Sequence, residues 1–268
     1  MTVLNLFEQA AECLAICDPR QKVQRTQLLY AQWCEGKLDI SAAPEVDVIG
    51  EAGRPERPEL VAPRDVPKRS MNTPEGRVVL CHALAHIEFN AINLALDALY
   101  RFRDMPVQYY GDWLKVASEE AYHFTLLESY LREHQSEYGD YAGHNGLWHM
   151  AQITADDVMV RMALVPRVLE ARGLDVTPGI IQKLEQAKDR ALIAHLNIIY
   201  RDEISHVAIG SHWFKFICEQ RKLNYRTTFK DLILQYMQGK LRGPFDDVAR
   251  MQAGFSAEEM ADLNAMNI

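Results

Sequence analysis

The stretch Tyr200-Arg-Asp-Glu-Ile-Ser-His206 places Glu203 and His206 three residues apart inside a long helical pattern. Residues at this spacing are neighbours on one face of an α-helix. Apolar residues such as Leu196 and Val207 continue the same face on either side. A carboxylate on an apolar helix face is costly unless it is paired, protonated or bound to a metal. We therefore expect Glu203 and His206 to have partners elsewhere in the chain.

The tetrad Glu120-Ala-Tyr-His123 repeats the Glu-x-x-His pattern, and these two tetrads are the only ones in the sequence. Two further glutamates complete a series. Glu88 is the one charged residue on the apolar face of a helix predicted over 74–100, and Glu170 lies near the end of a helix predicted over 155–172. Corresponding residues of the two halves are 82 or 83 positions apart. This regular offset predicts a duplicated pair of helices.

The order Glu, Glu-x-x-His, Glu, Glu-x-x-His is the ligand pattern of ferritin-like di-iron and di-manganese carboxylate bundles. Four carboxylates balance the charge of two divalent metals, whereas an empty site would crowd like charges in an apolar setting. Carboxylate and imidazole ligands suit iron or manganese. We predict two iron ions, two manganese ions or one of each, with a buried hydrogen-bonded network as the alternative. The predicted ligands are Glu88, Glu120, His123, Glu170, Glu203 and His206.

The rest of the chain indicates an all-α fold, because the alternation typical of strands is nearly absent. Helices are expected over residues 3–17, from Asp18-Pro19 to about residue 36, from Thr73-Pro74, and over 108–134. Residues 138–148 are predicted to form a loop. Ser256 and Glu259 predict a capping box for a short last helix.

The second half of the helical region carries several boundary signals. Thr154 is predicted to cap the helix over 155–172, and Gly173 to end it. Pro166 predicts a kink or bulge one turn before Glu170. Thr177-Pro178 is predicted to open the next helix, which reaches about residue 221 with a break near 187–189.

Residues 41–73 differ in composition, because five prolines interrupt any helix and basic residues alternate with them. The pattern is typical of extended, polyproline-like chain. It predicts either a strap whose arginines pair with acidic groups of its own domain or a basic arm that binds a phosphate-bearing partner. The acidic net charge of the chain favours the strap. The basic residues are Arg54, Arg57, Arg64, Lys68 and Arg69. The predicted segments are thus a helical N-terminal extension (1–40), the Pro-rich strap (41–73), a ferritin-like four-helix bundle (74–222) and a C-terminal helical cap (223–268).

The overall composition limits the class of protein. The chain has 268 residues and a formal net charge of −8, which disfavours a large nucleic-acid footprint. The N-terminus has no basic region before its apolar residues, so we expect no secretory signal. The sequence contains no run of about 18 apolar residues, so we expect no membrane span. Five scattered cysteines without a C-x-x-C pair predict reduced thiols in a cytoplasmic protein.

The sequence resembles the ferritin-like superfamily, and more closely an uncharacterised bacterial family known as domain of unknown function 455. The stretches that carry this resemblance are His82-Ala-Leu-Ala-His-Ile-Glu88, Ala121-Tyr-His123, Leu169-Glu-Ala-Arg-Gly-Leu-Asp175, Tyr200-Arg-Asp-Glu-Ile-Ser-His-Val207 and Leu241-Arg-Gly-Pro-Phe245. Two of them, Leu-Glu-Ala-Arg-Gly-Leu-Asp and Arg-Asp-Glu-x-x-His, are also similar to tRNA-modifying di-iron hydroxylases. The resemblance implies a di-metal helical bundle and leaves the substrate open.

The favoured function is an oxidoreductase whose di-metal centre activates dioxygen, with a hydroxylation or oxidation reaction and an electron donor as partner. Tyr200 and Arg167 are the candidate catalytic residues. Tyr200, one turn before Glu203, is expected to line the metal pocket or to be a hydrogen-bonded core residue. Arg167 is expected to face a substrate anion or to pair with a ligand carboxylate. We favour a small-molecule substrate over tRNA, because the net charge opposes nucleic-acid binding. A ferroxidase that handles iron and a non-catalytic, metal-stabilised binding scaffold are the alternatives.

Overall fold

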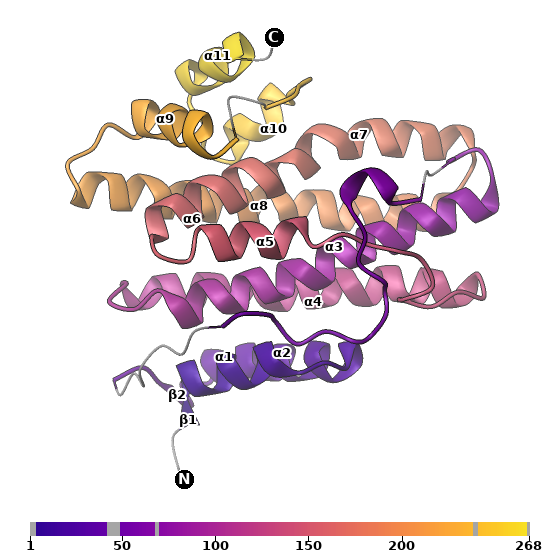
Figure 1. The fold of residues 1–268 in the computed structure, drawn as a ribbon, viewed down its shortest axis with the longest axis horizontal. Coiled ribbons are helices and arrows are strands. Elements are labelled where there is room, and N and C mark those ends of the chain that lie inside the picture. Colours follow the sequence, from indigo (N-terminus) through magenta and orange to yellow (C-terminus); the bar gives the residue numbers. More distant parts are fainter. Residues whose placement is uncertain (1–3, 42–48, 68–69, 238–240, 267–268) are drawn as a thin grey trace. The chain divides into compact units, whose positions relative to one another are not determined.

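Helices account for nearly all regular structure in the computed structural model, which describes residues 4–41, 49–67, 70–237 and 241–266 (Figure 1). Two strands of two residues each, β1 (Leu4–Asn5) and β2 (Leu38–Asp39), pair in parallel. The all-α prediction is therefore confirmed. Two basic residues of the predicted strap, Lys68 and Arg69, lie outside the described residues. The helices are α1 (Leu6–Ala15), α2 (Pro19–Cys34), η1 (Pro63–Asp65), α3 (Pro74–Arg101), α4 (Val107–Glu133), α5 (Gly146–Ile153), α6 (Val158–Leu164), η2 (Val165–Glu170), α7 (Ala171–Gln186), α8 (Arg190–Gln220), α9 (Tyr225–Met237), α10 (Asp247–Gln252) and α11 (Ala257–Met266).

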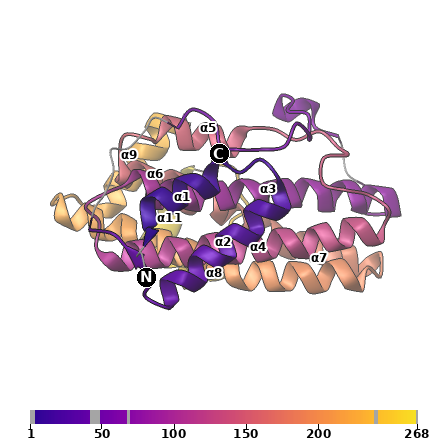
Figure 2. The same cartoon turned by 90° about the horizontal axis from the view of Figure 1, so that it is seen from below.

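The chain divides into two compact units, and the first comprises Met1–Gln152 with Lys183–His195. In this unit α3 and α4 lie side by side, α1 packs on α3, and α2 packs on α4 (Figures 1 and 2). Apolar side chains fill the space between them, among them Phe89, Trp113 and Phe124, each at most 2% exposed. Burial of such large side chains supplies most of the stability of a helical unit.

The second unit comprises Ile153–Gln182 and Leu196–Ile268. Here α6 packs on α9, and α11 contacts both α9 and α10. Its core contains Trp213, Phe214, Phe229 and Phe255. The ring of Phe229 meets those of Phe214 and Phe255 edge to face. The four-helix bundle and the four predicted segments, with boundaries at residues 41, 74 and 223, stay predictions.

The helices α2 and α3 begin at the N-cap residues that the sequence predicts, Asp18 and Thr73. The side chain of Asp18 accepts a hydrogen bond from the backbone N–H of Gln21, and Thr73 Oγ1 accepts one from the N–H of Gly76. Each cap precedes a proline at the first helical position, where the missing N–H is not needed. The caps of α2 and α3 are therefore confirmed.

The helix predicted over 155–172 and the one predicted from Thr177-Pro178 have different boundaries from those expected. The cap of α6 is Asp157, and Thr154 instead accepts a hydrogen bond from Arg161 Nε. Gly173 does not end the helix, and Pro178 lies inside α7, which runs on to Gln186. Pro178 is exposed, so water can satisfy the carbonyl group that its missing N–H leaves without a helical partner. The break predicted near 187–189 is confirmed, since Lys188 adopts a φ of 59°.

The described part of the strap, residues 49–67, is fixed to the first unit by backbone hydrogen bonds. The N–H of Gly53 donates to Leu14 O (2.8 Å), Val61 N–H donates to Gly143 O (2.9 Å), and Gly143 N–H donates to Glu59 O (2.9 Å). A Cβ on Gly53 would lie 2.3 Å from Ala15 O, so only glycine allows this close approach. These contacts support the interpretation of the segment as a strap.

Lys22 is the main side-chain anchor of the strap, and it is fully buried. Its ammonium group donates to Leu14 O (3.0 Å), to Gly53 O (2.8 Å) and to Asn93 Oδ1. Burial lowers the pKa of Lys22 from 10.5 to about 7. Neutral carbonyl oxygens satisfy the donors but cannot restore the lost hydration of the charge.

This lowered pKa predicts a pH dependence of stability. Between about pH 7 and pH 10.5 the unfolded chain binds a proton at Lys22 that the folded chain has released. The free energy of unfolding should therefore rise with pH in this range, by at most about 1.4 kcal/mol per pH unit. Lys22→Met should remove that part of the slope in urea titrations at pH 7, 8 and 9. Lys115→Met, at a half-buried position, should keep it. Equal slopes in the wild type and Lys22→Met would contradict the assignment.

One helix among the described residues, α3, is long and apolar enough to cross a membrane by length and composition. Charged residues such as Glu88 and Asp97 interrupt its apolar sequence. In the protein, 78% of its most apolar 18-residue window is buried. The helix thus serves as a core element of the first unit.

Candidate metal centre

The first unit brings three of the six predicted ligands together between α3 and α4. Glu88 comes from α3, and Glu120 and His123 lie three residues apart on α4. His123 Nδ1 lies 3.3 Å from Glu88 Oε2 and 3.3 Å from Glu120 Oε2. Each residue offers one ligand atom, and these atoms all lie within 4.8 Å of one another. Two carboxylates and an imidazole therefore meet at a distance that one metal ion can span.

Burial sets the electrostatics of this group. Glu88 is 5% exposed, and Glu120 and His123 are fully buried. Burial and the neighbouring Glu120 carboxylate together hold the pKa of Glu88 well above its usual range. Burial alone would lower the pKa of His123, but the hydrogen bonds and negative charge of Glu120 and Glu88 outweigh it and raise that pKa. Without a metal, these three groups therefore share protons that neutralise part of the carboxylate charge.

The other three predicted ligands lie in the second unit. His206 Nδ1 lies 3.5 Å from Glu203 Oε1, a separation close to the 3.3 Å between His123 Nδ1 and Glu120 Oε2. His206 is fully buried, whereas Glu203 and Glu170 are half-buried. The convergence of all six residues on one di-metal site stays a prediction.

Glu170 is the last residue of a π-helical turn, η2 (Val165–Glu170), so the bulge predicted from Pro166 is confirmed. A π-helical turn is a single-turn widening of an α-helix that occurs frequently at functional sites. Gly210 of α8 makes room for it, because a Cβ at this position would lie 2.2 Å from Pro166 Cγ. The glycine and the proline therefore form a complementary pair that accommodates the turn.

The two residues predicted to be catalytic have defined partners in the second unit. The hydroxyl of Tyr200 donates to Asp246 Oδ2 (3.3 Å), and burial followed by the negative charge of Asp246 raises the pKa of Tyr200. Arg167 is fully buried and donates to Glu259 Oε1 (2.6 Å), a carboxylate outside the six predicted ligands. A catalytic role for Tyr200 or Arg167 stays a prediction.

The structure also contains a buried ion pair that the sequence did not indicate. Asp175 accepts two hydrogen bonds of 2.8 Å from Arg250, through Nε and the terminal nitrogen. It accepts a third from the backbone N–H of Asp246 (3.0 Å). Arg172 donates to the carbonyl oxygen of Arg242 (2.9 Å). The contact of Arg172 with Arg242 joins two stretches more than 60 residues apart in the sequence, Leu169–Asp175 and Leu241–Phe245.

His82 and His86, both on α3, contact the loop that follows α4. His82 Nε2 accepts a hydrogen bond from the N–H of Gly139 (2.8 Å). His86 lies 2.9 Å from the hydroxyl of Tyr138 and 3.1 Å from His144 O. Both imidazoles therefore hold the loop after α4 against α3.

Comparisons with known proteins place the chain among relatives without a described function. The family described as "Protein of unknown function (DUF455)" matches residues 15–261. An uncharacterized protein of Haemophilus influenzae is 42% identical over 268 residues, which cover 96% of this chain and 93% of that protein. No solved structure matches the chain at a significant level.

Proposed function

We propose that this chain, which belongs to the DUF455 family, is a di-metal carboxylate protein that activates dioxygen. The observation that carries the proposal is the buried group of Glu88, Glu120 and His123, whose ligand atoms lie within 4.8 Å of one another. Glu170, Glu203 and His206 supply the matching half of the site. The spacing of 82 or 83 residues between corresponding ligands supports this pairing.

The residues of the first unit fit a metal ion on physical grounds. Two carboxylates buried beside each other are strongly unfavourable unless protons or a cation neutralise them. The raised pKa of Glu88 reflects this strain, first from burial and then from Glu120. Oxygen and nitrogen ligands of this type favour iron or manganese, and we propose two iron ions, two manganese ions or one of each as the cofactor.

Such a centre, when bound, would supply reducing equivalents and open coordination positions for dioxygen. The protein side chains contribute the geometry and the surroundings. Glu120 and His123 are held in register by one helix, and their full burial keeps bulk water away from the reacting atoms. Glu88, from the neighbouring helix, has a raised pKa and so holds a proton in the metal-free protein; it would lose this proton on serving as a ligand.

The proposed substrate is a small molecule rather than tRNA, with an electron donor as the second partner. The net charge of −8 opposes the phosphate backbone of a nucleic acid. The described part of the strap carries Arg54, Arg57 and Arg64, all exposed, and its backbone lies bonded to the first unit. Because its backbone is hydrogen-bonded to the first unit, the described part of the strap fits a structural role better than the role of a free basic arm.

Metal analysis followed by optical spectroscopy tests the proposal. Protein purified without chelator should contain close to two iron or manganese ions per chain. After anaerobic loading with Fe(II), exposure to dioxygen should produce a new absorption band in the near-ultraviolet or visible range, with consumption of oxygen. A chain that retains no metal under either condition would overturn the di-metal site. Bound metal without any response to oxygen would overturn oxygen activation alone, and uptake of iron far beyond two ions per chain would indicate a ferroxidase instead.

A further inference from the structure

We propose that Glu259 of α11 is a positioning residue for the metal centre. Through Arg167 it fixes the π-helical turn η2, whose last residue is the proposed ligand Glu170. This inference rests on the proposed function, and it assigns to the C-terminal helix a part in holding that site. All the residues that carry it lie in the second unit.

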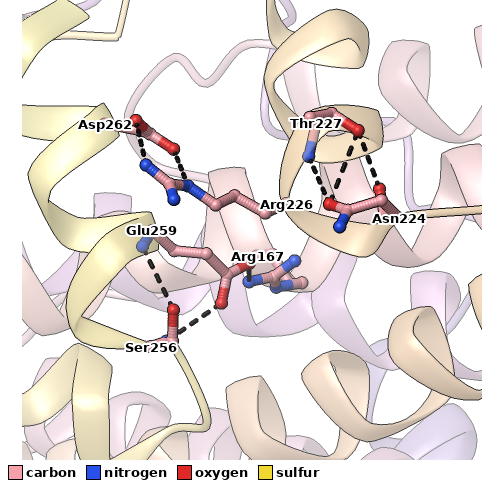
Figure 3. A network of polar contacts seen from close by, with 7 residues as sticks. All are labelled: Arg167, Asn224, Arg226, Thr227, Ser256, Glu259 and Asp262. Carbon is pink, nitrogen blue, oxygen red and sulfur yellow. Dashed lines mark hydrogen bonds and ion pairs between the residues drawn. The ribbon is translucent and has the colours of Figure 1, made fainter.

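The contact between Arg167 and Glu259 is fully buried. Arg167 is 0% exposed and Glu259 is 1% exposed, and the guanidinium donates to Glu259 Oε1 at 2.6 Å (Figure 3). The other two nitrogens of Arg167 have no hydrogen-bond partner among the described residues. The guanidinium carbon instead lies 4.1–4.8 Å from three ring centroids, those of Phe214, Phe229 and Phe255. The position of Arg167 is therefore set by one hydrogen-bonded anion and by cation–π contacts with three rings.

Glu259 is itself held in one orientation. Its N–H donates to Ser256 Oγ (3.2 Å), and the N–H of Ser256 donates to Glu259 Oε2 (2.9 Å), which confirms the predicted capping box. Lys215 Nζ lies 3.6 Å from the same oxygen, Oε2. The carboxylate thus uses Oε2 for its own helix and leaves Oε1 for Arg167. The start of α11 is thereby coupled to η2.

The turn is also confined on its other side by Pro166, which follows Val165 and packs against Gly210 of α8. A π-helical turn is intrinsically less favourable than an α-helical one and persists where surrounding contacts hold it. With Pro166 fixed by α8 and Arg167 fixed by α11, the backbone that leads to Glu170 has little freedom. Release of Arg167 should allow the turn to relax and should shift the carboxylate of Glu170.

Metal affinity measured on folded variants tests this role, with Mn(II) as the probe in titrations of the metal-free protein. Glu259→Ala should weaken Mn(II) binding by about 10- to 100-fold, the range seen when a group that orients a ligand is removed. Glu259→Gln keeps a hydrogen-bond acceptor for Arg167, so its Mn(II) affinity should fall less than that of Glu259→Ala. Asp262→Ala is the matched control, because Asp262 lies on the same helix and pairs with Arg226 of α9 (2.9 Å) rather than with η2 (Figure 3). Circular dichroism confirms that each variant is folded.

A double variant separates positioning from packing. Arg167→Met with Glu259→Leu replaces the buried ion pair by apolar side chains and should restore the stability of the metal-free protein. It should not restore Mn(II) affinity, because no directional contact then holds η2. Unchanged affinity in Glu259→Ala, or equal losses in Glu259→Ala and Asp262→Ala, would overturn the positioning role while the metal site stands. A wild type that binds no Mn(II) and no Fe(II) would overturn the metal site and the positioning role together.

Discussion

Addition of Fe(II) or Mn(II) to the metal-free protein should raise its melting temperature by about 5–10 °C when the metal is present at 100 times its dissociation constant. The reason is that metal binds the folded chain, in which Glu88, Glu120 and His123 are gathered, and not the unfolded chain. Glu120→Gln should abolish this rise, since the variant keeps the shape of the side chain but loses a charged ligand. Scanning calorimetry under anaerobic conditions, with and without chelator, measures both effects.

The neighbouring residue provides the control for this experiment. Glu119 carries the same carboxylate one position earlier on α4 and pairs with Lys115 (3.5 Å). Glu119→Gln should keep the full rise in melting temperature. A wild type that melts at the same temperature with metal and with chelator would contradict the site, as would a rise of equal size in Glu120→Gln.

Asp175→Ala should destabilise the protein by about 3–5 kcal/mol, because it leaves the guanidinium of Arg250 buried without its anion. The side chains of Asp175 and Arg250 are 0% and 2% exposed, and two hydrogen bonds of 2.8 Å join them. Asp262→Ala breaks the more exposed pair with Arg226 and should cost less than about 1 kcal/mol. Urea denaturation of the metal-free proteins gives both values.

Replacement of both Asp175 and Arg250 tells apart two causes of destabilisation, an unpaired buried charge and a loss of packing. Asp175→Leu with Arg250→Met removes the ion pair as a unit and should recover most of the lost stability. The interpretation would be wrong if Asp175→Ala cost no more than Asp262→Ala. It would also be wrong if the double variant were as unstable as Asp175→Ala.

The sequence was informative wherever a short-range rule decides the structure. The spacing of Glu120 and His123 placed both on one helix face, and Pro166 marked the site of the π-helical turn. The caps at Asp18 and Thr73 follow from hydrogen bonds within four residues. Local geometry fixes these features, so the amino-acid types alone could predict them.

Features that depend on distant contacts could not be predicted in this way. Gly173 and Pro178 are typical helix boundaries, yet α7 continues through both, and in the same stretch Asp175 is bound by Arg250 from far along the chain. The helix α5 occupies part of a segment predicted as a loop. Lys22 looks like a surface residue in the sequence, and only the convergence of three carbonyl oxygens explains its burial.

The way in which the strap is fixed has a consequence for the order of folding. Gly143 stands 82 residues after Val61 in the sequence, and the two are joined by a backbone hydrogen bond. The closure of so long a loop costs chain entropy before its contacts form, whereas α3 and α4 are joined by a connection of five residues. The helical pair should therefore form first and the strap should seat late. In unfolding the order reverses, so the strap is the segment where a protease first finds extended, accessible backbone.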